Sequence, residues 1–257
     1  MSIQRRKVHF FPSPNSRSKQ WQSNEALMLR KLSELADAPE LSIPASFGYQ
    51  TRTAYELLAK TEGHVANKSS PRHEHMGPSL RRFFLRPSPE PIVFSYLSLV
   101  REGDASLDRV GLLASSLFGS NLEVRSNDSS SAGLIGIPTA YIDAENVREC
   151  WAIRANRTKE NGALAWAIQR FLDASQIHPF HDGNGRLARA LFLIDLVRIF
   201  GNAGLAMLPI GPFVYLSSSD IRRSYGRIDD IGDDESFFEC ISDVILNTCE
   251  YVLSQRT

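Results

Sequence analysis

The sequence predicts a mainly α-helical protein, on three observations. Apolar residues recur at helical spacing in most segments, and prolines or glycines separate these segments from one another. Strand-like sequence is confined to residues 122–142, where short apolar runs and β-branched residues flank a serine-rich middle. No internal repeat is visible. This amount of predicted strand is too small to build a sheet. The core must therefore consist of helices packed on helices.

The N-terminal third of the chain divides into a tail and a helical extension. Residues 1–22 are basic and contain no acidic residue, which predicts a disordered tail. In the extension, residues 23–88, leucines near helical spacing predict a helix over residues 24–37, with Asn24 as its N-cap. The sequence from Thr53 predicts a second, short helix that ends near Gly63. Prolines and serines are dense beyond it, which predicts a linker at the end of the extension.

The main domain, residues 89–257, consists of successive helical patterns. Ser106 and Asp143 are suited to N-caps, and Gly201 is suited to end a helix. Residues 161–177 carry a wide apolar stripe and predict a buried helix. The predicted helices of the domain cover residues 91–103, 106–121, 143–157, 161–177, 186–200, 217–230 and 234–256.

Composition and charge exclude several classes of protein. The formal net charge is zero, which argues against bulk attraction to nucleic acid or to an anionic membrane. Three cysteines do not make a disulfide framework, and they fit a reducing compartment. No apolar run is long enough to span a membrane. We therefore expect a cytoplasmic protein without nucleic-acid or membrane partners, and the basic tail leaves open export into a host cell.

Residues 177–192, IHPFHDGNGRLARALF, combine turn-forming residues and charge at the start of a helix. Pro179 takes His178 out of the α region, so the preceding helix must end there. The DGNG sequence favours a turn, and helix resumes at about Arg186. Free backbone N–H groups and the positive end of the helix dipole form a cradle for an anion. Arg189 lies three residues after Arg186, so both can reach the same anion.

Two further residues of this stretch suit the chemistry of a nucleotide. Asp182 would hold Mg²⁺, which bridges phosphate oxygens, and His178 titrates near neutrality as a general base must. Each feature also has a plain structural explanation: a turn between helices, an N-cap aspartate, a core histidine and a solvated arginine face. Their conjunction favours one site that handles a nucleotide. A Walker-type P-loop is excluded, because GNGR stands where that motif has GK followed by Ser or Thr.

HPFHDGNGRLAR, residues 178–189, matches every specified position of HPFx(D/E)GNGRxxR, the signature of the Fic domain. The chain resembles this family over roughly residues 90–250, which implies a Fic-type helical bundle with a small β-hairpin flap. The resemblance implies transfer of AMP from ATP to a Ser, Thr or Tyr hydroxyl of a target protein, with Mg²⁺ and release of pyrophosphate. The related Doc proteins have a lysine where this chain has Gly185, so glycine favours nucleotide transfer.

The resemblance also assigns a role to each signature residue. His178 would deprotonate the target hydroxyl, and Asp182 would hold Mg²⁺ between the α- and β-phosphates. Phe180 would anchor the loop, the three residues after Asp182 would form the anion hole, and the two arginines would meet the outer phosphates. The residues expected to form the nucleotide site are Phe180, Gly183, Asn184, Gly185, Arg186 and Arg189.

Two elements outside the signature bear on target binding and regulation. Fic proteins hold the target as an added strand on the flap, and residues 122–142 are the stretch suited to this role, unless they form a plain surface loop. Many Fic proteins are restrained by a helix bearing (S/T)xxxE(G/N). Glu62 and Gly63 match its end, but Leu58 stands at the Ser/Thr position. Either Glu62 restrains Arg189, or the enzyme is unrestrained, or an antitoxin partner supplies the glutamate.

Other activities stay open at this point. The signature recognises phosphates and metal but not the base, so UMP or phosphocholine transfer from another diphosphate donor is an alternative. Removal of AMP from a modified target is a further variant. A silent module that binds a nucleotide or a partner is the non-enzymatic alternative, and the intact His178 and Asp182 argue against it. The partners expected are the target protein and an antitoxin or a second copy of the chain.

Overall fold

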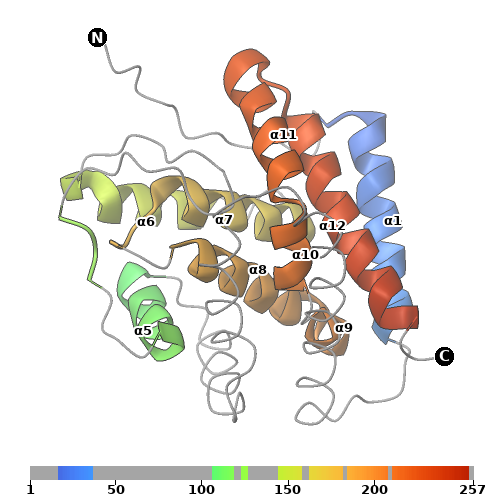
Figure 1. Ribbon diagram of the computed structural model, residues 1–257, viewed down its shortest axis with the longest axis horizontal. Helices are drawn as coiled ribbons and strands as arrows, with labels where there is room; N and C mark the ends of the chain where they lie inside the picture. The colour runs from blue at the N-terminus through green and yellow to red at the C-terminus, as the bar shows by residue number, and fades with distance from the viewer. Residues whose placement is uncertain are drawn as a thin grey trace, which may run out of the picture.

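Two helices, α7 and α8, pack side by side through the middle of the molecule (Figure 1). The computed structural model describes residues 17–36, 106–118, 123–126, 144–157, 162–181, 184–207 and 210–254. Most of these residues are helical, which confirms the predicted mainly α class. The helices are α1 Lys19–Ala36, α5 Leu107–Phe118, the 3₁₀ turn Ala144–Asn146, α6 Val147–Arg157, α7 Ala163–Ile177, α8 Asn184–Phe200, α9 Asn202–Ala206, α10 Ile210–Leu216, α11 Ser218–Ile231 and α12 Asp234–Ser254.

Helix α7 is the central helix of the core. Every residue from Leu164 to Ile177 is buried, as the sequence predicts for this segment. Helix α8 covers one side of it and α6 another, and α5 packs against α6. On the far side, α11 and α10 pack against α12 (Figure 1). A helix that is buried on all sides needs neighbours all round, and α8, α6 and a hydrogen bond from Gln176 to Tyr225 of α11 supply them for α7.

Helix α1 belongs to the same core, which corrects two expectations. It begins at Lys19 and not near Asn24, because the Ser18 hydroxyl accepts a hydrogen bond from the Trp21 N–H (3.0 Å) and caps it. The last residues of the predicted disordered tail are therefore helical. The Trp21 ring is 2% exposed and stacks on Phe238 of α12 with 3.8 Å between ring centroids. The first helix of the predicted extension is thus packed into the main domain.

Several other boundaries agree with the sequence. Helix α5 has Ser106 at its N-cap, where the hydroxyl accepts from the Arg109 N–H (3.4 Å). Gly201, with φ 54°, ends α8. Helix α8 begins at Asn184, two residues before the predicted start. The short helices α9 and α10 were not predicted. None of the described helices is long and apolar enough to cross a membrane.

Some predicted elements lie outside the described residues. They are the short helix from Thr53 to about Gly63, the helix over residues 91–103, the linker before residue 89, the Asp143 cap and residues 127–142 of the flap. Of the predicted flap, residues 123–126 are described. Val124 there forms an isolated antiparallel β-bridge with Phe180. The hairpin itself therefore stays a prediction, and its first residues lie against the loop between α7 and α8.

Candidate active site

The loop between α7 and α8 opens at His178, the C-cap of α7. His178 has φ 51° and ψ 59°, and its N–H donates to the Ala174 carbonyl (3.4 Å). Among the residues that the structure describes, it is the only non-glycine residue with positive φ. The prediction that Pro179 takes His178 out of the right-handed α region is confirmed, and the backbone adopts the left-handed region. A non-glycine residue rarely adopts these backbone angles unless its surroundings hold it there.

Two buried side chains fix the loop behind His178. Phe180 is 1% exposed, and a β carbon added to Gly111 of α5 would lie 3.5 Å from its ring. Asn184, 2% exposed, donates through Nδ2 to the Phe180 carbonyl (2.7 Å) and accepts at Oδ1 from the Phe180 N–H (2.9 Å). The Asn184 side chain therefore closes the loop on itself.

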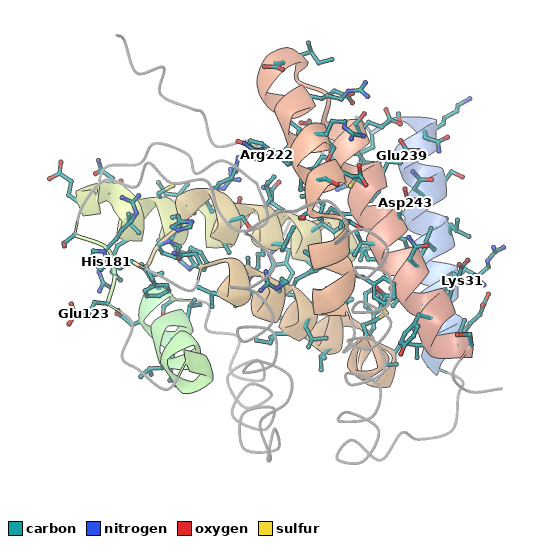
Figure 2. The ribbon with its side chains drawn as sticks, viewed as in Figure 1. Lys31, Glu123, His181, Arg222, Glu239 and Asp243 are labelled. Atoms are coloured by element: carbon teal, nitrogen blue, oxygen red, sulfur yellow. The ribbon has the colours of Figure 1, made fainter. Side chains whose placement is uncertain are left out.

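The segment 123–126 crosses the loop from the other side. The Arg125 N–H donates to the Pro179 carbonyl (2.9 Å), and its Nε donates to the His178 carbonyl (3.0 Å). The Ser126 N–H donates to Nε2 of His181 (3.4 Å). Figure 2 labels His181 and Glu123 on the side of the view where α5 lies. Sequence reasoning missed Arg125, because nothing in its local pattern indicates a partner 53 residues away.

The start of α8 offers the features of an anion site. The first N–H groups of a helix have no partner within it, and they point along the positive end of the dipole. Gly185 lies in this first turn and is buried, and it adds no side chain there. Arg189 lies four residues later, hence on the same face of the helix, and is 6% exposed. His178 thus follows the last residue of α7, and Gly185 and Arg189 lie in the first two turns of α8, one short loop away.

Residues 133–196 match the Fic/DOC family. The chain contains a Fic domain. The match includes α7, the loop and most of α8, and so contains all of residues 178–189. A solved structure of a Fic family protein from Desulfovibrio desulfuricans G20 is 14% identical and has a TM-score of 0.65, over 95% of this chain and 77% of that chain. This likeness shows a common fold. The comparison with curated proteins gives no match.

Part of the signature lies outside the described residues. Asp182, Gly183 and the Arg186 side chain are not described, and neither is Glu62. The described residues contain no group of three or more His, Cys, Asp or Glu side chains that would hold a metal. A single carboxylate at Asp182 fits Mg²⁺ that arrives with a nucleotide, because this ion is usually held by one or two carboxylates and substrate phosphates.

A buried ion pair supports α7 of the Fic domain from α6. Arg154 pairs with Asp173, which also accepts from Nε2 of Gln169 (2.9 Å). Burial raises the pKa of Asp173, and Arg154 opposes this effect. All three side chains are buried. Removal of one member would leave a buried charge without its counter-ion, so the pair fixes how α6 lies on α7.

Proposed function

We propose that this Fic domain transfers AMP from ATP to a Ser, Thr or Tyr hydroxyl of a target protein. A Fic domain indicates a Fic-type transferase, and the choice of AMP and of a protein hydroxyl is the proposal. One observation carries it. A titratable side chain, His178, stands at the left-handed end of α7, one short loop from the N-terminus of α8. Base and phosphate cradle are therefore parts of one unit.

The chemistry assigned to these residues is a displacement at the α-phosphorus. His178 accepts the proton of the target hydroxyl, and the hydroxyl oxygen forms a bond to the α-phosphorus of ATP. The bond from that phosphorus to the bridging oxygen breaks, and pyrophosphate leaves. The N–H groups at the start of α8 and the two arginines stabilise the negative charge on the phosphates. Asp182 would hold Mg²⁺, which neutralises phosphate charge when bound.

The flap completes the proposal on the side of the target. The target would add to residues 122–142 as an extra strand, since an exposed strand edge binds a peptide through its backbone. The placement of residues 123–126 against the loop supports this arrangement, because they are hydrogen-bonded to the loop that carries His178. The hydroxyl of the added strand would then come within reach of His178.

The test is a labelling experiment with a panel of donors. The protein is incubated with Mg²⁺, cell lysate and label from ATP, UTP, GTP or CDP-choline, and the modified protein is identified by mass spectrometry. We expect label from ATP on a target hydroxyl or on the enzyme itself. His178→Ala should abolish transfer but keep nucleotide binding, measured by calorimetry. Asp182→Ala should raise the Mg²⁺ concentration that transfer requires.

Each outcome of this panel decides between the candidate activities. Transfer from UTP or CDP-choline alone would replace the donor and keep the reaction class. Loss of AMP from a pre-modified target would identify the enzyme as a remover of AMP. A His178→Ala protein that transfers at the wild-type rate would refute the base assignment. Nucleotide binding without transfer from any donor would identify the chain as a silent binding module.

A further inference from the structure

The strained backbone at His178 requires something to hold it. A non-glycine residue keeps the left-handed conformation only where the surrounding structure holds it there. The residue before a proline normally prefers extended geometry. His178 is in this state at φ 51° and ψ 59°. Its conformation sets where the imidazole points. Whatever fixes the peptide groups on either side of His178 therefore also positions the side chain.

Arg125 contacts the carbonyls of three consecutive residues at this point. Its Nε donates to the His178 carbonyl (3.0 Å) and its Nη2 to the Ile177 carbonyl (3.5 Å), while its backbone N–H donates to the Pro179 carbonyl (2.9 Å). Arg125 is 3% exposed. The last carbonyls of a helix have no partner within the helix, and they form the negative end of its dipole. A planar cation with several donors suits both properties.

The surroundings explain why a buried cation is accommodated here. Burial raises the pKa of the Cys150 thiol, and the positive charges of Arg154 and Arg125 oppose this effect. Arg154 binds Asp173. The charge of Arg125 faces the carbonyl end of α7. The C-terminal end of α7 thus carries a partial negative charge, of about half an elementary charge, that balances the charge of Arg125.

We infer that Arg125 is a positioning residue that holds the left-handed turn at His178. The inference concerns the conformation of His178, and it rests on the proposed function only where it assigns a consequence for the rate. Arg125 also lies in residues 123–126, the described beginning of the predicted flap, and these residues are hydrogen-bonded to the backbone around His178. On the proposed function, Arg125 would then contribute both to docking of the target on the flap and to placement of His178.

The first test measures the backbone of His178 directly and needs no activity. The amide–α-proton coupling and the ¹³Cα and ¹³Cβ shifts of His178 report its φ and ψ, and the His178→Gln variant assigns the signals. Arg125→Met keeps the length of the side chain but removes its charge and donors. We expect the His178 signals of this variant to lose their left-handed values. Arg154→Met, which removes a buried arginine bound to Asp173, should keep them.

Arg125→Lys keeps the test decisive if Arg125→Met does not fold. Lysine retains the charge, but its ammonium group lacks the planar fork that spans two carbonyls. We expect His178 signals between those of the wild type and those of an extended residue. Left-handed values equal to the wild type in every folded Arg125 variant would overturn the inference.

The second test separates positioning from binding. In Arg125→Met, kcat for transfer should fall on the order of 10²-fold, since a displaced catalytic group costs about this much. The dissociation constant and the stoichiometry for ATP should stay within about two-fold, which a partly unfolded protein would not show. Arg125→Lys should recover part of kcat. An unchanged kcat in Arg125→Met would contradict the inference, whereas a wild type without transfer from any donor would contradict only the proposed function.

Discussion

Replacement of Asn184 by alanine tests how the loop of the Fic signature is held. The Asn184 amide satisfies both backbone groups of Phe180, at 2.7 and 2.9 Å, in a buried position. Alanine leaves that N–H and that carbonyl without their partner. Each buried backbone group that loses its partner costs about 1–3 kcal/mol, so the two together cost about 2–6 kcal/mol. The free energy of unfolding in urea should fall by this amount.

Asn184→Asp is the matched control, because aspartate has the same shape. Its carboxylate still accepts from the Phe180 N–H, but an oxygen replaces the donor that faces the Phe180 carbonyl. At neutral pH the variant should therefore be at least as unstable as Asn184→Ala. Burial beside a carbonyl raises the pKa of the new carboxyl in the folded state. Its stability relative to wild type should then rise as the pH falls, because the protonated acid donates again.

Urea unfolding at pH 7 and at pH 5 measures both effects. An Asn184→Ala protein within about 1 kcal/mol of the wild type would refute the reasoning, because it would mean that the Phe180 backbone groups find other partners at no cost. A gap between Asn184→Asp and the wild type that does not narrow at pH 5 would refute the electrostatic part alone.

Three other variants test the core, a buried charge and the proposed restraint. Trp21→Ala should lower the free energy of unfolding by about 3–5 kcal/mol in urea, because the ring is 2% exposed and stacks on Phe238; a loss below about 1 kcal/mol would make α1 a dispensable extension. Burial raises the pKa of Asp195 to about 6 from 3.8, although neighbouring arginines oppose it. The folded state holds this proton more tightly than the unfolded state does. The free energy of unfolding of the wild type, relative to that of Asp195→Asn, should therefore fall by up to about 3 kcal/mol as the pH rises from 3.8 to about 6. A difference that does not change with pH would refute the shift. Glu62→Gly should raise the rate of transfer if Glu62 restrains Arg189, and an unchanged rate would exclude Glu62 from the site.

The elements that the sequence predicted well carry their information locally. The apolar stripe of residues 161–177 predicted a buried helix, and Ser106 predicted the start of α5; both are confirmed. The start of α1 was wrong for a related reason. The leucines of residues 24–37 suggested one apolar face, but Leu29 is 43% exposed, and Trp21 begins the buried face. The partner of Trp21 lies in α12, at the other end of the chain, and no local pattern indicates it.

The candidate site shows the same division between local and distant information. Pro179 predicted correctly that the chain leaves the α region at His178, because that restriction acts between neighbouring residues. The clamp formed by the Asn184 side chain was not predicted, since a GNG sequence indicates a turn without saying which groups close it. Arg125 was predicted only as part of a flap. Its contacts with the end of α7 depend on how the segments pack.

The signature therefore contains two kinds of residue with separate consequences. His178 and the start of α8 present chemical groups, whereas Phe180 and Asn184 hold the loop that presents them. The holding groups extend beyond the signature to Arg125, and the Phe180 ring packs on α5. A chain could match every position of the signature and still misplace His178 if these distant contacts were lost. For this reason the rate of transfer should respond to Arg125, which lies far outside the signature, whereas the affinity for the nucleotide should not.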